Sequence, residues 1–153
     1  MEIRPDDPMR REVGHVIARH LALMRQVTPP ESIHALPAEG LAGRETAFFT
    51  LRGEDGTILG MGAIKTIEPG HGEIKSMHVV EEARGRGLSR LLLDHLLQVA
   101  RDRGLRRVSL ETGAQAAFRP AVALYESAGF ARCGPFTGYV EDANSIFMTL
   151  RLD

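Results

Sequence analysis

The apolar positions of this 153-residue chain follow two patterns, one with the period of a helix and one with that of a strand. Residues 86–103 give the strongest helical pattern, because leucines and a valine line one face while charged residues line the other. Helices are also predicted at 8–27 and 119–128, where Pro8 and Pro120 suit the first turn. Three amphipathic helices therefore need a common surface on which to bury their apolar faces.

Shorter apolar runs bounded by turn residues predict strands that supply this surface. They lie at residues 1–5, 46–52, 57–67, 73–80, 106–112 and 145–152, and a further extended segment begins at Phe130. Asp55-Gly56 is a hairpin signal, so the second and third strands should pair antiparallel. The strand–helix–strand order of residues 73–112 implies a parallel pair with a right-handed crossover. The pattern thus predicts a mixed α/β sheet with helices on its faces, in one domain over residues 1–153.

Two local features qualify this outline. Residues 31–41 are short and turn-rich, and they form either a flap over a site or a simple connection, which the sequence favours. In the strand at 73–80, alternation assigns residues to two faces if no bulge interrupts it. Ile74, Ser76 and His78 then share one face, and Glu73, Lys75, Met77 and Val79 share the other.

Composition and charge exclude several classes of function. The net charge is −1 and aromatic residues make up 5% with no tryptophan, which argues against a nucleic-acid-binding protein. No apolar run approaches the length of a membrane span, and the first residues lack the apolar core of a signal peptide. Cys133 is the one cysteine and fits a reducing cytoplasm. The six histidines show no metal-site spacing, so no metal is expected.

The stretch "EARGRGLSRLLLDHLL" (residues 82–97) carries the candidate chemistry. A glycine-rich turn between a strand and a helix places free backbone N–H groups at the positive end of the helix dipole, which suits a phosphate. A P-loop would need Gly-Lys-Ser/Thr, which is absent, and a dinucleotide fingerprint would need glycine where Arg90 stands. Taken alone, the pattern is equally consistent with a solvated helix start.

The flanking residues resemble the GNAT acetyltransferase superfamily. Arg84, Gly87 and Ser89 match its Arg/Gln-x-x-Gly-x-Gly/Ala acyl-CoA signature, with Ser89 departing from Gly/Ala at the last position. "ALYESAGF" (residues 123–130) resembles its second signature, a helix that ends in LYxxxGF. "GHGEIKSM" and "SIFMTLRL" further resemble a little-characterised bacterial branch of this superfamily. The resemblance implies a GNAT-like fold, whose mixed, mostly antiparallel twisted sheet contains a central parallel pair.

The resemblance also implies acetyl-CoA as co-substrate and an acceptor amine on a small molecule or a protein. The pyrophosphate cradle would comprise Arg84, Gly85, Arg86, Gly87, Leu88, Ser89 and Arg90. The backbone of Met77, His78 and Val79 would bind the pantetheine arm beside a bulge, like an added strand. A non-catalytic acyl-CoA-binding module is the alternative from another class. Dimers are common in this superfamily, so a homodimer is also an expectation.

Roles in the reaction follow from the same resemblance. Tyr125 stands at the position of the family's general acid, which would protonate the departing thiolate, although a tyrosine packed on the sheet is the alternative. Glu73 is a candidate general base, weighed equally against a partner of Lys75. The wider substrate set comprises Lys75, Glu111, Thr112, Gly113, Phe118 and His34, and Glu111 is a second candidate for the base or for amine binding.

Overall fold

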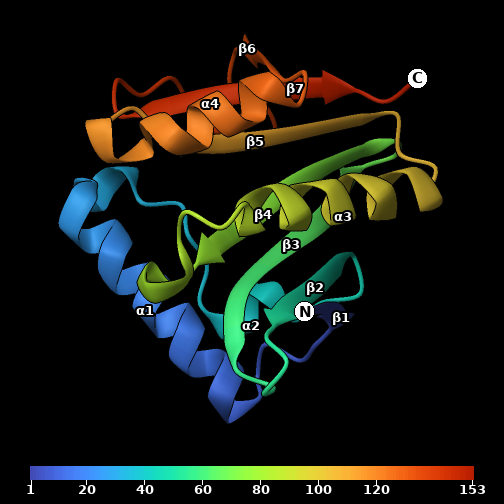
Figure 1. Cartoon of the computed structure of the whole chain (residues 1–153). Helices are drawn as coiled ribbons and strands as arrows, with labels where there is room; N and C mark the ends of the chain where they lie inside the picture. The colour runs from blue at the N-terminus through green and yellow to red at the C-terminus, as the bar shows by residue number, and fades with distance from the viewer.

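In the computed structural model, residues 1–153 form a seven-stranded sheet with helices on both faces (Figure 1). The strands are β1 (Glu2–Pro5), β2 (Thr46–Arg52), β3 (Ile58–Glu68), β4 (His71–Val79), β5 (Arg107–Gly113), β6 (Ala131–Cys133) and β7 (Ser145–Arg151). The helices are α1 (Arg11–Val27), α2 (Ala38–Leu41), α3 (Leu88–Asp102) and α4 (Arg119–Ser127), with short 3₁₀ turns at Pro30–Ser32, Glu81–Ala83 and Ala116–Phe118.

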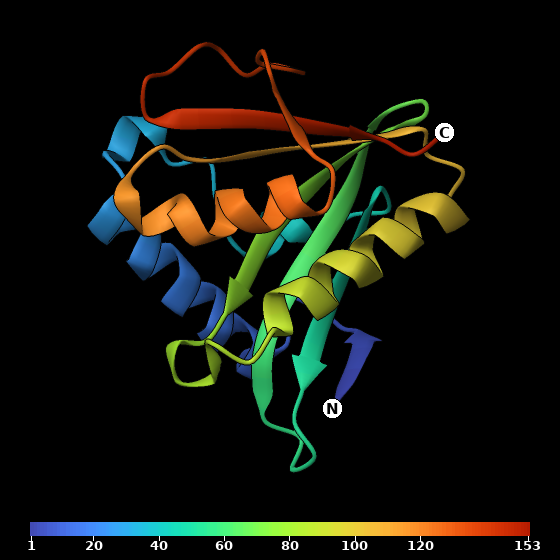
Figure 2. The same cartoon turned by 45° about the horizontal axis from the view of Figure 1, so that its top comes forward.

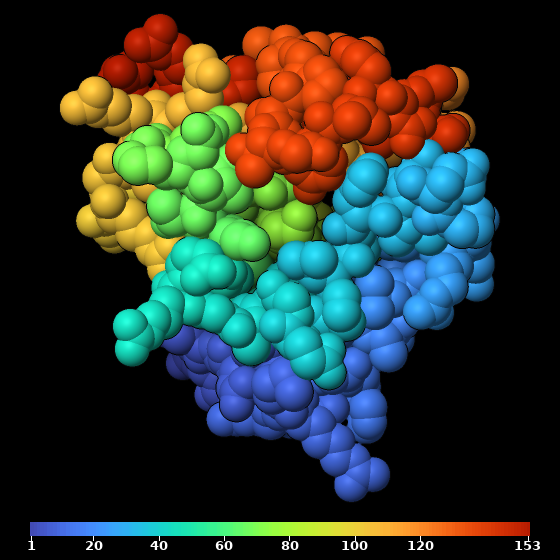
Figure 3. All heavy atoms as spheres, turned by 180° about the vertical axis from the view of Figure 1, so that it is seen from behind, coloured from blue at the N-terminus to red at the C-terminus, as the bar shows by residue number.

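The sheet order is β1-β2-β3-β4-β5-β7-β6, and every pair is antiparallel except β4 with β5. This confirms the predicted mixed sheet, its hairpin and its central parallel pair. Figure 2 shows α3 and α4 together in front of the sheet, and Figure 3 shows the segments of α1 and α2 on the rear face. None of these helices is long and apolar enough to cross a membrane.

Two predicted helices begin later than their apolar patterns suggested. The first starts at Arg11 instead of residue 8, because residues before it form a turn in which the Asp7 carboxylate accepts a hydrogen bond from the Met9 amide. Helix α3, predicted from residue 86, starts at Leu88, because Gly85 and Gly87 have φ of 79° and 74°. Such left-handed residues cannot continue a helix, so the glycines set its first residue.

Strand β4 contains a bulge that changes which face its later residues occupy. Lys75 pairs with Ala63 and His78 pairs with Met61, so two residues of β4 lie opposite one residue of β3. Ser76, inside the bulge, has a φ of 55°. The bulge that the family resemblance implied beside Met77 is therefore present, and the alternation, which assumed an uninterrupted strand, ends at Ser76. Because of the extra residue, His78 shares a face with Lys75 instead of lying opposite to it.

The core is held mainly by α3 and the middle of the sheet. Leu92, Leu93 and Leu96 of α3 are fully buried against β3, β4 and their neighbours. Each contributes about 2 kcal/mol through burial of apolar surface. This packing fixes α3 beside β4, so that the first turn of the helix lies just past the end of that strand.

Candidate active site

The parallel strands β4 and β5 separate soon after they meet, and a cavity opens where they part. Their pairing covers only His71 to Glu73 of β4, which face Arg107 to Ser109 of β5. The rest of β4 has no partner on that side. A cavity of about 630 Å³ lies there, with walls from β4, β5, α1, α4 and the first turn of α3. Both faces of the molecule therefore contribute side chains to one cavity.

At one end of the cavity lies the first turn of α3. No side chain caps this helix, since Gly87 is its N-cap residue and offers no hydroxyl or carboxylate. The amide groups of the first turn are therefore free for a ligand, and they lie at the positive end of the helix dipole. The Arg84 guanidinium donates to the Val79 carbonyl at 3.2 Å, which ties the turn to the end of β4. Arg90 bridges to α4 through the Ser127 hydroxyl at 3.2 Å.

In the middle of the cavity lies the Tyr125 hydroxyl, on α4. Its ring is 7% exposed and packs edge-on against Phe130. The one polar neighbour of its oxygen is the Met77 sulfur at 4.0 Å, a weak acceptor. Burial and the nearby Glu111 charge raise the pKa of Tyr125 to about 12. At neutral pH the phenol thus keeps its proton and has no strong partner within the protein.

At the other end of the cavity, Glu73, Lys75 and Tyr139 form a hydrogen-bonded cluster. The Tyr139 hydroxyl donates to Glu73 Oε2 at 2.5 Å, and Lys75 Nζ lies 3.1 Å from both the same carboxylate oxygen and the Tyr139 oxygen. Glu73 is 5% exposed, so this ion pair is largely shielded from water. Burial, followed by the Glu73 charge, raises the pKa of Tyr139 far above its usual range. Tyr139 therefore remains a hydrogen-bond donor to the carboxylate.

Glu111 on β5 lies in the same end of the cavity but has no cationic partner. Its carboxylate accepts one hydrogen bond, from the Ser145 hydroxyl at 2.8 Å, and forms no salt bridge. Burial raises the pKa of Glu111, although the Ser145 hydrogen bond and the charges of His34 and Lys75 oppose the shift. A carboxylate in this situation binds a cation more strongly than one already paired with lysine.

Two loops that are far apart in the sequence cover this end. They are the α1–α2 loop (residues 28–37) and the β6–β7 loop (residues 134–144), which lie next to each other on the rear face (Figure 3). The Ser32 hydroxyl donates to Asp142 at 2.5 Å, and Asn144 donates to the Ser32 oxygen at 3.3 Å. The His34 and Tyr139 rings meet edge to face at 5.0 Å between centroids. The loops thus hold each other over the cavity.

A buried histidine pair also borders the cavity. Nδ1 of His20 on α1 lies 3.1 Å from Nδ1 of His78 on β4, so one ring donates its proton to the other. Burial lowers the pKa of His20 to about 4 and that of His78 to about 3, the latter with help from neighbouring positive charges. Both rings are therefore neutral at physiological pH. No cluster of three or more histidine, cysteine or acidic side chains has a geometry that would hold a metal ion.

Residues 18–130 match the family model described as the acetyltransferase (GNAT) family. The chain belongs to this family. The sequence is also 45% identical over 152 residues to the uncharacterized N-acetyltransferase YsnE of Bacillus subtilis, covering 99% of this chain and 100% of YsnE. A protein of Azospirillum brasilense named IAA acetyltransferase is 38% identical over 147 residues, 95% of this chain and 94% of its own length.

A crystal structure from Klebsiella pneumoniae shares the fold of this GNAT protein. That protein, provisionally assigned as an acyl-CoA N-acyltransferase, is 29% identical, and the two structures superpose with a TM-score of 0.82. The superposition covers 99% of this chain and 97% of the other. The whole element order described above is therefore that of a GNAT domain.

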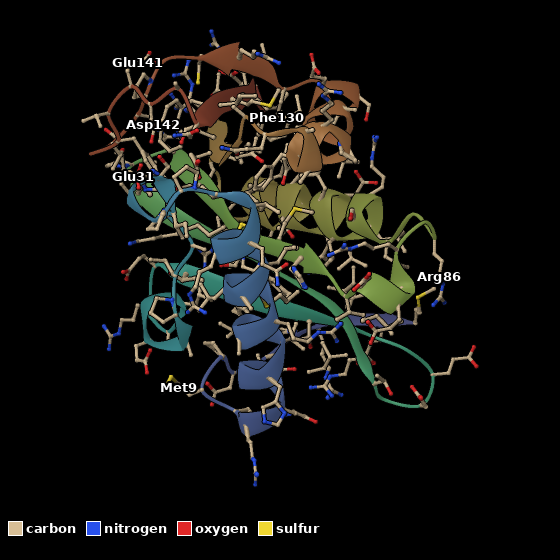
Figure 4. The ribbon with its side chains drawn as sticks, turned by 90° about the vertical axis from the view of Figure 1, so that its left-hand side faces the viewer. Met9, Glu31, Arg86, Phe130, Glu141 and Asp142 are labelled. Atoms are coloured by element: carbon tan, nitrogen blue, oxygen red, sulfur yellow. The ribbon has the colours of Figure 1, made fainter.

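Nearly all the residues predicted for the GNAT site line this one cavity. These are Glu73, Lys75, Met77, His78, Val79, Arg84, Gly85, Gly87, Leu88, Ser89, Arg90, Glu111, Thr112, Gly113, Phe118, Tyr125 and His34. Arg86 is the exception, since it lies outside the cavity and is fully on the surface side of the turn (Figure 4). Phe118 packs so closely on Gly113 that any side chain there would collide with its ring. Cys133 lies on the exposed edge strand β6, away from the cavity.

The sequence prediction missed several residues that complete the site. Tyr139 is the most important, because it joins Glu73, Lys75 and His34. It lies in the β6–β7 loop, where no periodicity marks a position as buried. The one available signal was the pair of aromatic residues, Phe136 and Tyr139, in a segment that otherwise resembles a turn-rich loop. Residues 31–41, predicted as a connection, contribute to the wall through Ser32, His34 and their neighbours.

Proposed function

We propose that this GNAT protein transfers the acetyl group of acetyl-CoA to an amine by direct attack within a ternary complex. One observation carries the proposal: a single cavity joins an uncapped helix terminus, an unpartnered tyrosine hydroxyl and a carboxylate cluster. These three features suit a pyrophosphate, a leaving thiolate and an amine, in that order along the cavity.

The cofactor end suits the pyrophosphate of acetyl-CoA. The free amides of Leu88, Ser89 and Arg90 would donate to its oxygens, and the left-handed Gly85 and Gly87 let the backbone approach closely. Arg84 and Arg90 add positive charge at the same end of the cavity. Beyond the turn, the unpaired edge of β4 near Met77 offers backbone groups to the pantetheine amides, in the manner of an added strand.

The chemistry then needs a base, an acid and correct positioning. The amine nitrogen attacks the thioester carbonyl carbon, and Glu73 or Glu111 accepts a proton from nitrogen, directly or through water. The carbon–sulfur bond breaks as the tetrahedral intermediate collapses, and the electron pair leaves on sulfur. Tyr125 donates its proton to that sulfur and regains one from solvent. The products are the acetylated amine and free CoA.

Direct attack is favoured over an acetyl-enzyme intermediate. Cys133 lies away from the cavity, so no thiol is available to take the acetyl group first. Holding both reactants in one cavity also makes the attack effectively unimolecular, which accounts for much of the rate enhancement in such enzymes. A cytoplasmic location is part of the proposal, because a lone cysteine suits a reducing compartment that supplies acetyl-CoA.

The test has two readouts on the wild-type protein. Calorimetric titration with acetyl-CoA should show saturable binding at one site per chain. A panel of amines, followed by thiol release and by the mass of the product, should give at least one amide. Binding without transfer to any amine would support the acyl-CoA-binding module instead, and absence of binding would refute both.

A further inference from the structure

The acceptor end of the cavity has a distinct chemistry of its own. Its wall on α1 is formed by Leu23, Met24 and Val27, spaced as one face of a helix. Closer to the start of α1, the same face buries Val13, Val16 and Ile17 in the core. The apolar face thus continues past the sheet, and its last part stays half-exposed toward the cavity. Ile33, from the α1–α2 loop, extends this apolar wall.

Opposite this wall the charges are predominantly negative. Lys75 is the one lysine or arginine at this end, since the two other such residues of the cavity, Arg84 and Arg90, lie at the α3 turn. Lys75 is already paired with Glu73 and Tyr139. Glu111 forms no salt bridge, although the charges of His34 and Lys75 act on its carboxylate from a greater distance. A positively charged acceptor would complete this arrangement, and a negatively charged one would face an unpaired carboxylate.

The two loops that cover this end carry the same sign of charge. The α1–α2 and β6–β7 loops together contain Glu31, Glu141 and Asp142 and no lysine or arginine. Figure 4 shows these three carboxylates gathered at one corner, where the two loops meet. Negative charge at an entrance attracts cations and repels anions before contact. The covering loops and the interior of the cavity therefore favour an acceptor of the same charge.

The covering of the cavity limits the size of the acceptor. The Ser32–Asp142 hydrogen bond and the His34–Tyr139 contact join the two loops over the acceptor end. A folded protein could not present an internal lysine there without separating the loops. A small molecule needs no such opening. Its size is limited as well, because the whole cavity of about 630 Å³ also has to hold the pantetheine arm.

We propose that the acceptor is a small cationic amine with an apolar body and without a carboxylate. The inference rests on the proposed function and specifies its substrate class. In this arrangement the ammonium lies at Glu111, and the apolar body lies along Leu23, Met24 and Val27. Amino acids are excluded, because their carboxylate would lie beside Glu73 and Glu111, where the one lysine is already paired with Glu73. Diamines without an apolar body are excluded because they would leave the α1 wall uncovered.

The test compares amines that differ in one feature at a time. Phenethylamine carries the expected features, L-phenylalanine adds a carboxylate, putrescine lacks the apolar body, and the dipeptide amide Phe-Ala-NH₂ represents a peptide terminus. We expect kcat/KM for phenethylamine to exceed that for L-phenylalanine by on the order of a hundredfold, from the repulsion of like charges. Putrescine should be at least about tenfold poorer than phenethylamine, since it loses contact with the apolar wall. The dipeptide amide keeps an apolar body but should be poorer by a similar factor, since it is too long for the end of the cavity that the two joined loops cover.

A matched pair of variants connects the preference to the wall. Val27→Asn places a polar group on the cavity side of α1, and Gln26→Asn places the same residue on the exposed side next to it. KM for phenethylamine should rise about tenfold in Val27→Asn and stay unchanged in Gln26→Asn. Calorimetry with acetyl-CoA and a melting curve on both variants check that the cofactor end and the fold are intact.

Each outcome separates this inference from the proposed function. Equal or better use of L-phenylalanine, putrescine or the dipeptide amide would overturn the substrate class while leaving acetyl transfer intact. An unchanged KM in Val27→Asn with normal acetyl-CoA binding would also overturn it. Absence of transfer to every amine, despite acetyl-CoA binding, would instead refute the proposed function on which the class depends.

Discussion

The two ends of the cavity are built in different ways. The cofactor end comes from one short stretch, residues 84–90, and it offers mainly backbone amides at a helix terminus. The acceptor end combines side chains from α1, β4, β5 and two loops more than a hundred residues apart, as in the Ser32–Asp142 contact. The first end can bind the same phosphate in every relative that keeps the turn. The second end can change its acceptor through a few side chains.

The largest expected effect concerns the residue between the two ends. Tyr125→Phe removes the hydroxyl that would protonate the thiolate and leaves the buried ring in place. We expect kcat to fall on the order of a hundredfold or more, with acetyl-CoA affinity unchanged. Thiol release with a working amine, followed by stopped-flow or in the steady state, measures kcat, and calorimetry measures the affinity for acetyl-CoA. An unchanged kcat would leave Tyr125 with a packing role alone.

The next effect tests the cofactor end by itself. Ser89→Glu puts a carboxylate on the uncapped first turn of α3, where the pyrophosphate would bind. Acetyl-CoA affinity should fall about ten- to a hundredfold because like charges meet. The melting temperature should not fall, since an acidic residue suits a helix N-terminus. Gln98→Glu, with the same charge change on the exposed side of α3, is the control and should bind normally. Equal binding by both variants would contradict the assigned cradle.

At the acceptor end, Glu111→Gln should separate substrate binding from stability. KM for a cationic amine should rise about tenfold, the equivalent of one charge-assisted hydrogen bond. Because burial raises the pKa of Glu111, the folded state favours its protonated form, and the charged form lowers stability near neutral pH.

The variant should accordingly melt at a higher temperature than the wild type at pH 7 to 8. That gain should disappear as the pH falls through the ordinary range of a glutamate, about 4, where the wild type is protonated too. Melting curves across this range provide the measurement. A variant that is less stable at neutral pH and keeps its KM would mean that Glu111 is a structural partner of Ser145.

The smallest effect concerns the two loops that cover the acceptor end. The double variant Glu31→Gln/Glu141→Gln removes two exposed carboxylates from the corner labelled in Figure 4. At low ionic strength we expect kcat/KM for a cationic amine to fall about two- to threefold, because the loops attract the amine less strongly. The difference should vanish near 1 M salt, where charges are screened within about 3 Å. An equal loss of kcat/KM with a neutral substrate, or a loss that does not depend on salt, would contradict this explanation and indicate that the two side chains contact the substrate.

The two ends of the cavity also differ in how much of each could be predicted from the sequence. The strands, the three long helices and the parallel pair were predicted correctly, because each has a clear period and clear turn residues. Local geometry was less accessible: the family resemblance implied a bulge in this strand, but its place at Ser76 depends on how β4 meets β3, and so does the face that His78 occupies. The GNAT signatures pointed to the turn at residues 84–90, whose proposed function depends on consecutive residues.

The acceptor end was only partly accessible, since its contacts join distant segments. Glu73, Lys75 and Glu111 were named as candidates through the family resemblance. Tyr139, which links two of them, lies in a loop without periodicity and could be found only from the fold. The His20–His78 contact likewise requires α1 to cross β4 at one particular height.

The central claim is that acetyl-CoA and the amine occupy the cavity together and react directly. The most direct measurement is a matrix of initial velocities, with acetyl-CoA and a working amine varied against each other. Double-reciprocal plots should give lines that intersect, as a ternary complex requires. Parallel lines would show that CoA leaves before the amine binds, and that result would contradict direct attack in this cavity.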